Sequence, residues 1–151
     1  MAKCVVVLNA GSSSIKFAVY AVGPEQPALF RGQIERIGVA PRMNISNAEG
    51  QRVTEAAWSA NELDHREGTK VILATLRDLL KGGTVVAIGH RIAHGGLDYA
   101  TPVRVDGDVL RALSKLAPLA PLHQPHNLAP IETIAAAAPQ MPQVACFDTA
   151  F

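Results

Sequence analysis

The chain has 151 residues, enough for one domain with a hydrophobic core of its own. Fourteen basic and thirteen acidic residues nearly cancel, and no cluster of Lys or Arg favours nucleic acid or an anionic membrane as a partner. The apolar run near the N-terminus is shorter than a signal peptide core or a membrane span, so we expect a soluble cytoplasmic protein.

The first predicted element is a β-hairpin whose tip suits an anion. Residues 4–8 are apolar and β-branched, which predicts a central strand, and residues 15–20 predict a second one. Between them, the small residues from Asn9 to Ser14 let a ligand approach backbone N–H groups and hydroxyls closely. Lys16 adds a cation. The tip is therefore a predicted phosphate site, with an ordinary Ser-rich turn as the alternative; it lacks the second glycine of a Walker A motif.

The next stretch predicts a meander of strands. Residues 28–37 partly alternate between apolar and polar side chains, which indicates a third strand. Ile45 and Val53 mark two short, weakly signalled strands around a turn.

A helix and a buried strand follow. Asn61 is the expected N-cap of a helix, with Glu62 and Asp64 in its first turn, and Gly82-Gly83 ends it. Residues 84–88 then form a continuous apolar run, typical of a strand buried on both faces. Strand, helix and strand in this order predict an α/β layer architecture.

The segment Gly-His-Arg-Ile-Ala-His-Gly-Gly, residues 89–96, is expected directly after that strand. Ligands of open α/β sheets bind at the carboxyl ends of strands. Arg91 offers a rigid fork of donors for carboxylate or phosphate, and its position favours this role over a surface ion pair. His90 and His94 have the spacing of a zinc pair but lack the accompanying glutamate, so we do not expect them to hold a metal.

The last third predicts two helices and a strand. Residues 105–117 predict the first helix, and residues 128–138, capped by Asn127, predict the second. The proline-rich loop between them holds His123, which either contacts a ligand or is hydrogen-bonded within the loop. An apolar strand then runs into Asp148. Cys4 and Cys146 lie in strand-like runs without C-x-x-C spacing, so we expect buried, reduced thiols.

Four blocks of the sequence resemble the signature blocks of acetate kinases. They are N-A-G-S-S-S-I-K (9–16), G-H-R-I-A-H-G-G (89–96), A-P-L-H-Q-P (120–125) and F-D-T-A-F (147–151). The resemblance implies an α/β fold, the ribonuclease H-like domain of the actin, hexokinase and Hsp70 superfamily, with a mixed sheet flanked by helices. It implies Mg²⁺-dependent phosphoryl transfer between ATP and acetate, giving acetyl phosphate and ADP.

The resemblance also implies roles on the nucleotide side of the site. Asn9 would help hold magnesium. Lys16 would contact the nucleotide phosphates, with Ser12 and Ser14 nearby.

On the acetate side, Arg91 would bind the carboxylate, and Ala93 and Leu122 would line the methyl pocket. His123 would stand by the transferring phosphoryl group. Asp148 corresponds to the family's catalytic carboxylate; because acetate has no proton to lose, we expect Asp148 to orient other groups rather than act as a base.

Two departures accompany the resemblance. Gln124 replaces the family's usual asparagine, and the chain stops where family members continue. We therefore expect residues 1–151 to be an N-terminal domain without the nucleotide-binding domain, inactive alone, from a protein that is a homodimer at full length. Alternatives are a propionate or butyrate kinase of the same family, or a non-catalytic binding or assembly module that keeps the fold.

Overall fold

The computed structural model describes residues 3–23, 28–92, 103–105 and 124–147. The two described helices are α1 (His65–Leu79) and α3 (Gln124–Ala137). The strands are β1 (Lys3–Ala10), β2 (Ile15–Ala21), β3 (Ala28–Glu35), β4 (Arg42–Asn47), β5 (Arg52–Ala57), β6 (Thr84–Ile92), β7 (Val103–Arg104) and β8 (Gln143–Phe147).

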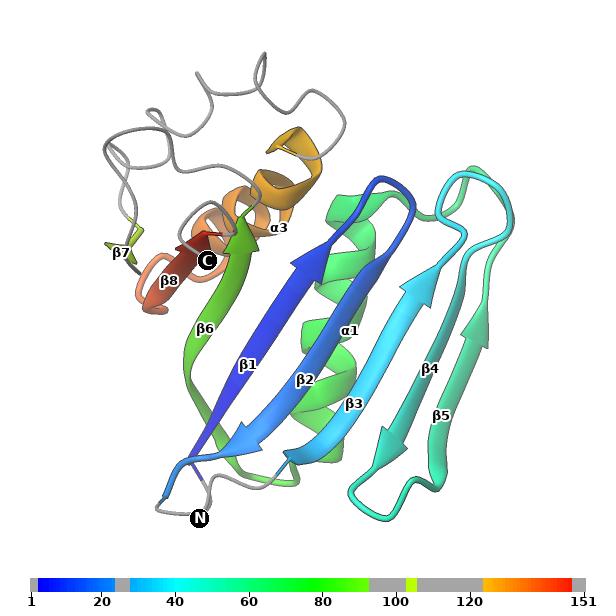
Figure 1. Ribbon diagram of the computed structural model, residues 1–151. Coiled ribbons are helices and arrows are strands. Elements are labelled where there is room, and N and C mark those ends of the chain that lie inside the picture. Colours follow the sequence, from blue (N-terminus) through cyan, green and yellow to red (C-terminus); the bar gives the residue numbers. More distant parts are fainter. Residues whose placement is uncertain (1–2, 24–27, 93–102, 106–123, 148–151) are drawn as a thin grey trace.

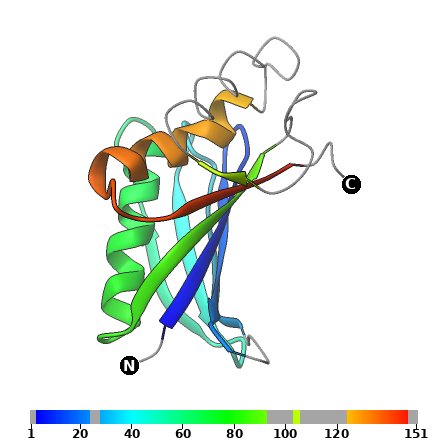
Figure 2. The ribbon, with the colours of Figure 1, turned by 90° about the vertical axis from the view of Figure 1, so that its left-hand side faces the viewer.

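The strands form one mixed sheet in the order β5-β4-β3-β2-β1-β6-β8-β7. The meander from β1 to β5 is antiparallel, whereas β1, β6 and β8 run parallel to one another. As Figure 1 shows, the arrowheads of these three strands point to the same edge of the sheet. Both described helices cover one face of the sheet (Figure 2). The predicted α/β class with a mixed sheet is confirmed.

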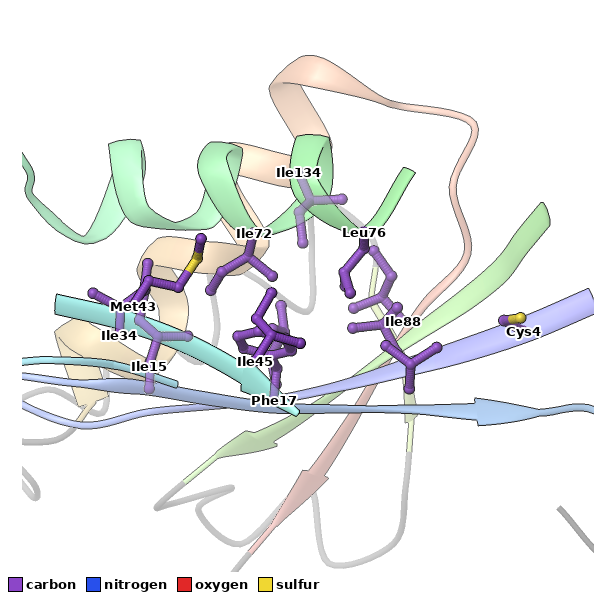
Figure 3. Close-up of a cluster of buried hydrophobic side chains, with 14 of the residues drawn as sticks. Cys4, Ile15, Phe17, Ile34, Met43, Ile45, Ile72, Leu76, Ile88 and Ile134 are labelled. Atoms are coloured by element: carbon purple, nitrogen blue, oxygen red, sulfur yellow. The ribbon is translucent and has the colours of Figure 1, made fainter. Parts of the chain in front are cut away.

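The core lies between that face and the helices. Along β1 the side chains alternate, with Cys4, Val6 and Leu8 buried and the residues between them more exposed, as expected for a strand with one covered face. Figure 3 shows side chains of the sheet directed toward Ile72 and Leu76 of α1. Cys4 is a buried free thiol, as predicted, and burial raises its pKa.

The start of α1 differs from the prediction. Asp64, not Asn61, is the N-cap: its backbone is extended, and its side chain accepts a hydrogen bond from the N–H of Glu67 at 2.8 Å. Glu62 lies before the helix and accepts from the N–H of Ser59 at 2.8 Å instead. Asn and Asp are both favourable N-cap residues, so residue type alone could not show whether Asn61 or Asp64 caps the helix. The end of α1 at Leu79, just before the predicted glycine stop, is confirmed.

Three other predicted boundaries were wrong. β6 continues to Ile92, so Gly89, His90 and Arg91 lie inside the strand, because pairing with β8 extends it beyond the apolar run. α3 begins at Gln124 rather than after Asn127, since a proline at the second helical position needs no intrahelical N–H bond. Val105 does not start a helix; its N–H donates to the carbonyl of Gln143 at 2.8 Å.

The remaining elements follow the prediction. The strands expected at residues 15–20 and 28–37 are present as β2 and β3, the two weak ones around Ile45 and Val53 as β4 and β5, and the apolar strand before Asp148 as β8. Neither described helix is long and apolar enough to cross a membrane.

Candidate active site

The candidate site lies at the edge of the sheet where β1, β6 and β8 end. Leu8 of β1 pairs with His90 of β6, and Arg91 of β6 pairs with Cys146 of β8. The tip that joins β1 to β2 lies at this edge as well (Figure 1). The sheet topology therefore gathers segments that are about eighty residues apart in the sequence, as the parallel pairing of β1 and β6 requires.

Asn9 and Lys16 form a direct cross-strand pair at the base of the tip. Leu8, Ala10, Ile15 and Phe17 are buried on the helix-covered face, so Asn9 and Lys16 belong to the opposite, open face. Lys16 is exposed and Asn9 half-buried. The amide oxygen of Asn9 and the ammonium of Lys16 are thus presented on one side of the sheet.

Arg91 belongs to the same face. His90, its neighbour in β6, is buried on the helix side, and Arg91 is exposed. Leu8 of β1 pairs with His90 of β6, and the two strands are parallel. The next residue of each strand, Asn9 and Arg91, therefore lies at the same level of the sheet. Lys16 and Arg91 are then separated by two strand spacings, about 10 Å between backbones. Lys16 and Arg91 are thus two cations on one face of the sheet, with one strand between them.

The tip itself is a tight four-residue loop. The N–H of Gly11 donates to the carbonyl of Ser14 at 2.8 Å, and the N–H of Ile37 donates to the carbonyl of Ser13 at 2.9 Å. A Cβ on Gly11 would lie 3.3 Å from Ser14 Oγ, so the glycine makes room for that hydroxyl. Ser12 is exposed and Ser14 half-buried. The Gly11 N–H is therefore used within the loop and is not available to a ligand.

His90 of the Gly-His-Arg segment is part of the core rather than the open face. Its Nε2 lies 2.6 Å from the side-chain oxygen of Gln143, whose amide nitrogen donates to the carbonyl of Ile131 at 3.3 Å. Burial lowers the pKa of His90 to about 4, with the Gln143 hydrogen bond acting in the opposite direction. The ring is therefore neutral at physiological pH and ties β6 to β8 and α3.

Several predicted site residues lie outside the described residues. They are Ala93, Leu122, His123 and Asp148; His94, which was not expected to hold a metal, and residues 106–117 of the predicted helix also lie outside the described residues. The last described residue before Asp148 is Phe147, at the end of β8, which pairs with Ile92.

The sequence was compared with protein-family profiles and with known proteins. The sequence profile of the Acetokinase family matches residues 4–151. This chain belongs to the acetokinase family. An acetate kinase from Rhizobium meliloti is 44% identical over an alignment of 149 residues that covers 97% of this chain and 37% of that protein. The chain thus spans little more than a third of the length of such relatives, and it corresponds to their N-terminal part.

Solved structures of acetokinase relatives have the same fold. The chain superposes on acetate kinase from Porphyromonas gingivalis with a TM-score of 0.82 and 30% identity, over 99% of this chain and 38% of that one. For a propionate kinase from Francisella tularensis the TM-score is 0.81 with 30% identity, over 98% and 37% of the two chains. The ribonuclease H-like fold expected from the motifs is confirmed.

The acetokinase family implies ATP and Mg²⁺, and the described residues fit the phosphates better than the metal. Lys16 and the serine hydroxyls suit phosphate oxygens. Asn9 offers Mg²⁺ a single oxygen, and within the described ranges no three His, Cys, Asp or Glu side chains gather into a metal-binding group. Because Mg²⁺ keeps waters and substrate phosphates as most of its ligands, a single protein oxygen from Asn9 is compatible with its binding.

Sequence reasoning missed two residues near the site, His65 and Gln143. His65, the first residue of α1, has Nε2 2.7 Å from the carbonyl oxygen of Gly11. No motif marks either residue. Their roles depend on how α1 and β8 pack against the first hairpin and β6, which is tertiary information.

Proposed function

We propose that this chain is the N-terminal domain of an acetate kinase, which transfers a phosphoryl group between ATP and acetate. The observation that carries the proposal is the pairing of β1 with both β2 and β6, which puts Lys16 and Arg91 on one face of the sheet and supports a site where phosphates and a carboxylate bind side by side. Family membership supports the reaction type.

On the nucleotide side, Lys16 neutralises charge on the phosphates, and the hydroxyls of Ser12 and Ser14 donate hydrogen bonds to them. Asn9 gives one oxygen ligand to Mg²⁺, which when bound shields the negative charge of the phosphates. Phosphoryl transfer needs positioning and charge neutralisation more than covalent help from the protein. These donors, set on a short loop and two paired strands, supply both.

On the acetate side, the Arg91 guanidinium holds the carboxylate so that one oxygen faces the γ-phosphorus. That oxygen forms the new P–O bond while the bond to the β–γ bridging oxygen breaks and ADP leaves. Ala93 and Leu122 line the methyl pocket, and His123 stands beside the transferring group. Asp148 orients neighbouring groups, because the attacking carboxylate carries no proton to be removed.

In this proposal, catalysis requires a second domain in addition to residues 1–151. Because the chain spans only 37% of the length of its relatives, residues 1–151 alone are expected to form no acetyl phosphate. The kinase that contains this domain is expected to act in the cytoplasm as a homodimer.

The test supplies the purified full-length kinase with ATP, Mg²⁺ and acetate and traps any acetyl phosphate that forms with hydroxylamine. The same assay is run in parallel on residues 1–151 alone. We expect acetyl hydroxamate from the former and none from the latter. A full-length protein that binds ATP but forms no acyl phosphate from any short carboxylate would favour the non-catalytic module instead.

A second candidate is a propionate kinase, favoured by the equally good superposition on the Francisella tularensis enzyme. One methylene changes discrimination by only about 1 to 3 kcal/mol, so closely related pockets separate the two substrates weakly. The ratio of kcat/KM for acetate and propionate decides between them, and we expect acetate to be preferred.

A further inference from the structure

Among the described contacts, the side chain of His65 links the tip of the first hairpin to α1. His65 Nε2 lies 2.7 Å from the carbonyl oxygen of Gly11, across 54 residues of sequence. A carbonyl oxygen only accepts hydrogen bonds, so Nε2 carries the proton and donates. The ring is half-buried, which limits competition from water.

The composition of the tip makes such a tie important. Ala10, Gly11 and the three serines have little side-chain volume to pack, so polar contacts decide the shape of the loop. The described contacts fix the tip internally at Gly11, and to the segment after β3 through Ser13. His65 adds the contact to a helix. Ser12, which is exposed, depends on these ties for its orientation.

α1 is a rigid anchor for this contact. Gly68, one turn after His65, approaches β2 and β3 so closely that a Cβ there would lie 3.3 Å from the Cδ1 atoms of Ile15 and Ile34. Ile72, another turn on, is fully buried. Asp64 caps the helix immediately before His65. The position of the imidazole is therefore set by the core and not by the loop.

We propose that His65 is a positioning residue for the nucleotide: its ring N–H holds the Gly11 carbonyl and thereby fixes the serines of the hairpin tip toward the phosphates. This inference rests on the proposed kinase function. His65 does not touch the reacting atoms; it acts through the backbone of the loop.

Two variants of the full-length kinase test it. His65→Phe keeps a ring but removes the donor, and His65→Gln keeps a donor at similar reach. Hydrogen exchange of the peptide spanning residues 9–17 is expected to be several-fold faster in His65→Phe and close to wild type in His65→Gln. The β4–β5 hairpin, residues 42–57, is the internal control and is expected to exchange alike in all three proteins.

Kinetics give the second readout. Loss of one hydrogen bond of ordinary strength predicts a rise of about three- to tenfold in KM for ATP for His65→Phe, restored in His65→Gln, with KM for acetate unchanged. Unchanged exchange of residues 9–17 in His65→Phe would overturn the inference. So would faster exchange of the 42–57 control, because His65 would then support the whole fold.

The two hypotheses fail in different ways. A wild-type protein without acetate-dependent ATP turnover contradicts the kinase function. A wild-type kinase whose His65→Phe variant keeps its KM for ATP contradicts only the role of His65.

Discussion

His90 Nε2 and the side-chain oxygen of Gln143 lie 2.6 Å apart in the buried region where β6, β8 and α3 meet. His90 is the residue directly before Arg91 in β6. The strand that carries the exposed Arg91 guanidinium is therefore held in place by a buried polar network. Removing either partner would leave a buried polar group unsatisfied.

The pH dependence of stability follows from this pair. Burial lowers the pKa of His90 from 6.5 to about 4, so the folded protein binds fewer protons than the unfolded chain between these values. His90 therefore does not reduce the free energy of unfolding above pH 6.5. As the pH falls from 6.5 toward 4, the free energy of unfolding decreases by roughly 3 kcal/mol because of this residue.

Urea unfolding of the wild type and His90→Asn between pH 7.5 and 4 checks this. Carboxyl groups titrate in both proteins, so a difference between them in how steeply the free energy of unfolding changes with pH is due to His90. The free energy of unfolding is expected to fall less steeply with decreasing pH in the variant. Parallel pH curves for the two proteins would show that His90 is not held neutral by folding.

Gly32 in β3 is a close-packing position. A Cβ there would lie 2.5 Å from Phe17 Cζ and 2.7 Å from the carbonyl oxygen of Asn44. We expect Gly32→Ala to lower the free energy of unfolding by about 1 to 3 kcal/mol, because the backbone oxygen cannot move aside cheaply.

Gly89→Ala in β6 is the matched control. The nearest atom to a Cβ at Gly89 is Val7 Cγ2 at 3.8 Å, an ordinary contact. Chemical denaturation of both variants should separate them clearly. Equal stability for the two would mean that the sheet around Gly32 is more loosely packed than the distances indicate.

The cap of α1 gives a third prediction. Asp64→Ala removes the side-chain acceptor of the Glu67 N–H and is expected to destabilise the protein by about 1 kcal/mol. Asn61→Ala, at the residue that sequence alone favoured as the cap, is expected to be nearly neutral. Thermal unfolding of the two variants decides, and a larger loss for Asn61→Ala would reverse the assignment.

The sequence predicted the strands, the α/β architecture and the position of the segment 89–96 near the end of a strand, because apolar runs and glycine-flanked polar segments are local signals. β1 and β6 were recognisable from their continuous hydrophobic stretches. It did not predict that β6 continues through Arg91, because β8 extends the strand through pairing that no local pattern records.

The same limit applies to the site. Lys16 and Arg91 were proposed as site residues from motif and position, and both lie on the open face of the sheet. His65 and Gln143 were missed, since each acts through a residue more than fifty positions away. Secondary-structure patterns indicate which face a residue belongs to, but not which backbone carbonyl it meets.

The fourth prediction separates the two sides of the site by substitution in the full-length kinase. Lys16→Ala is expected to raise KM for ATP and leave KM for acetate nearly unchanged, because in the proposed mechanism the Lys16 ammonium binds the phosphates. Loss of a charge-assisted hydrogen bond implies an effect of about 10- to 100-fold. Arg42→Ala, which removes an exposed cation from β4, is the charge control and is expected to match the wild type.

The most direct measurement is the steady-state kinetics of Arg91→Ala with each substrate varied in turn. If Lys16 and Arg91 bind opposite ends of one reacting complex, KM for acetate rises about 10- to 100-fold while KM for ATP stays within about twofold of the wild type. An Arg91→Ala kinase with unchanged acetate kinetics would contradict the shared site at this edge of the sheet.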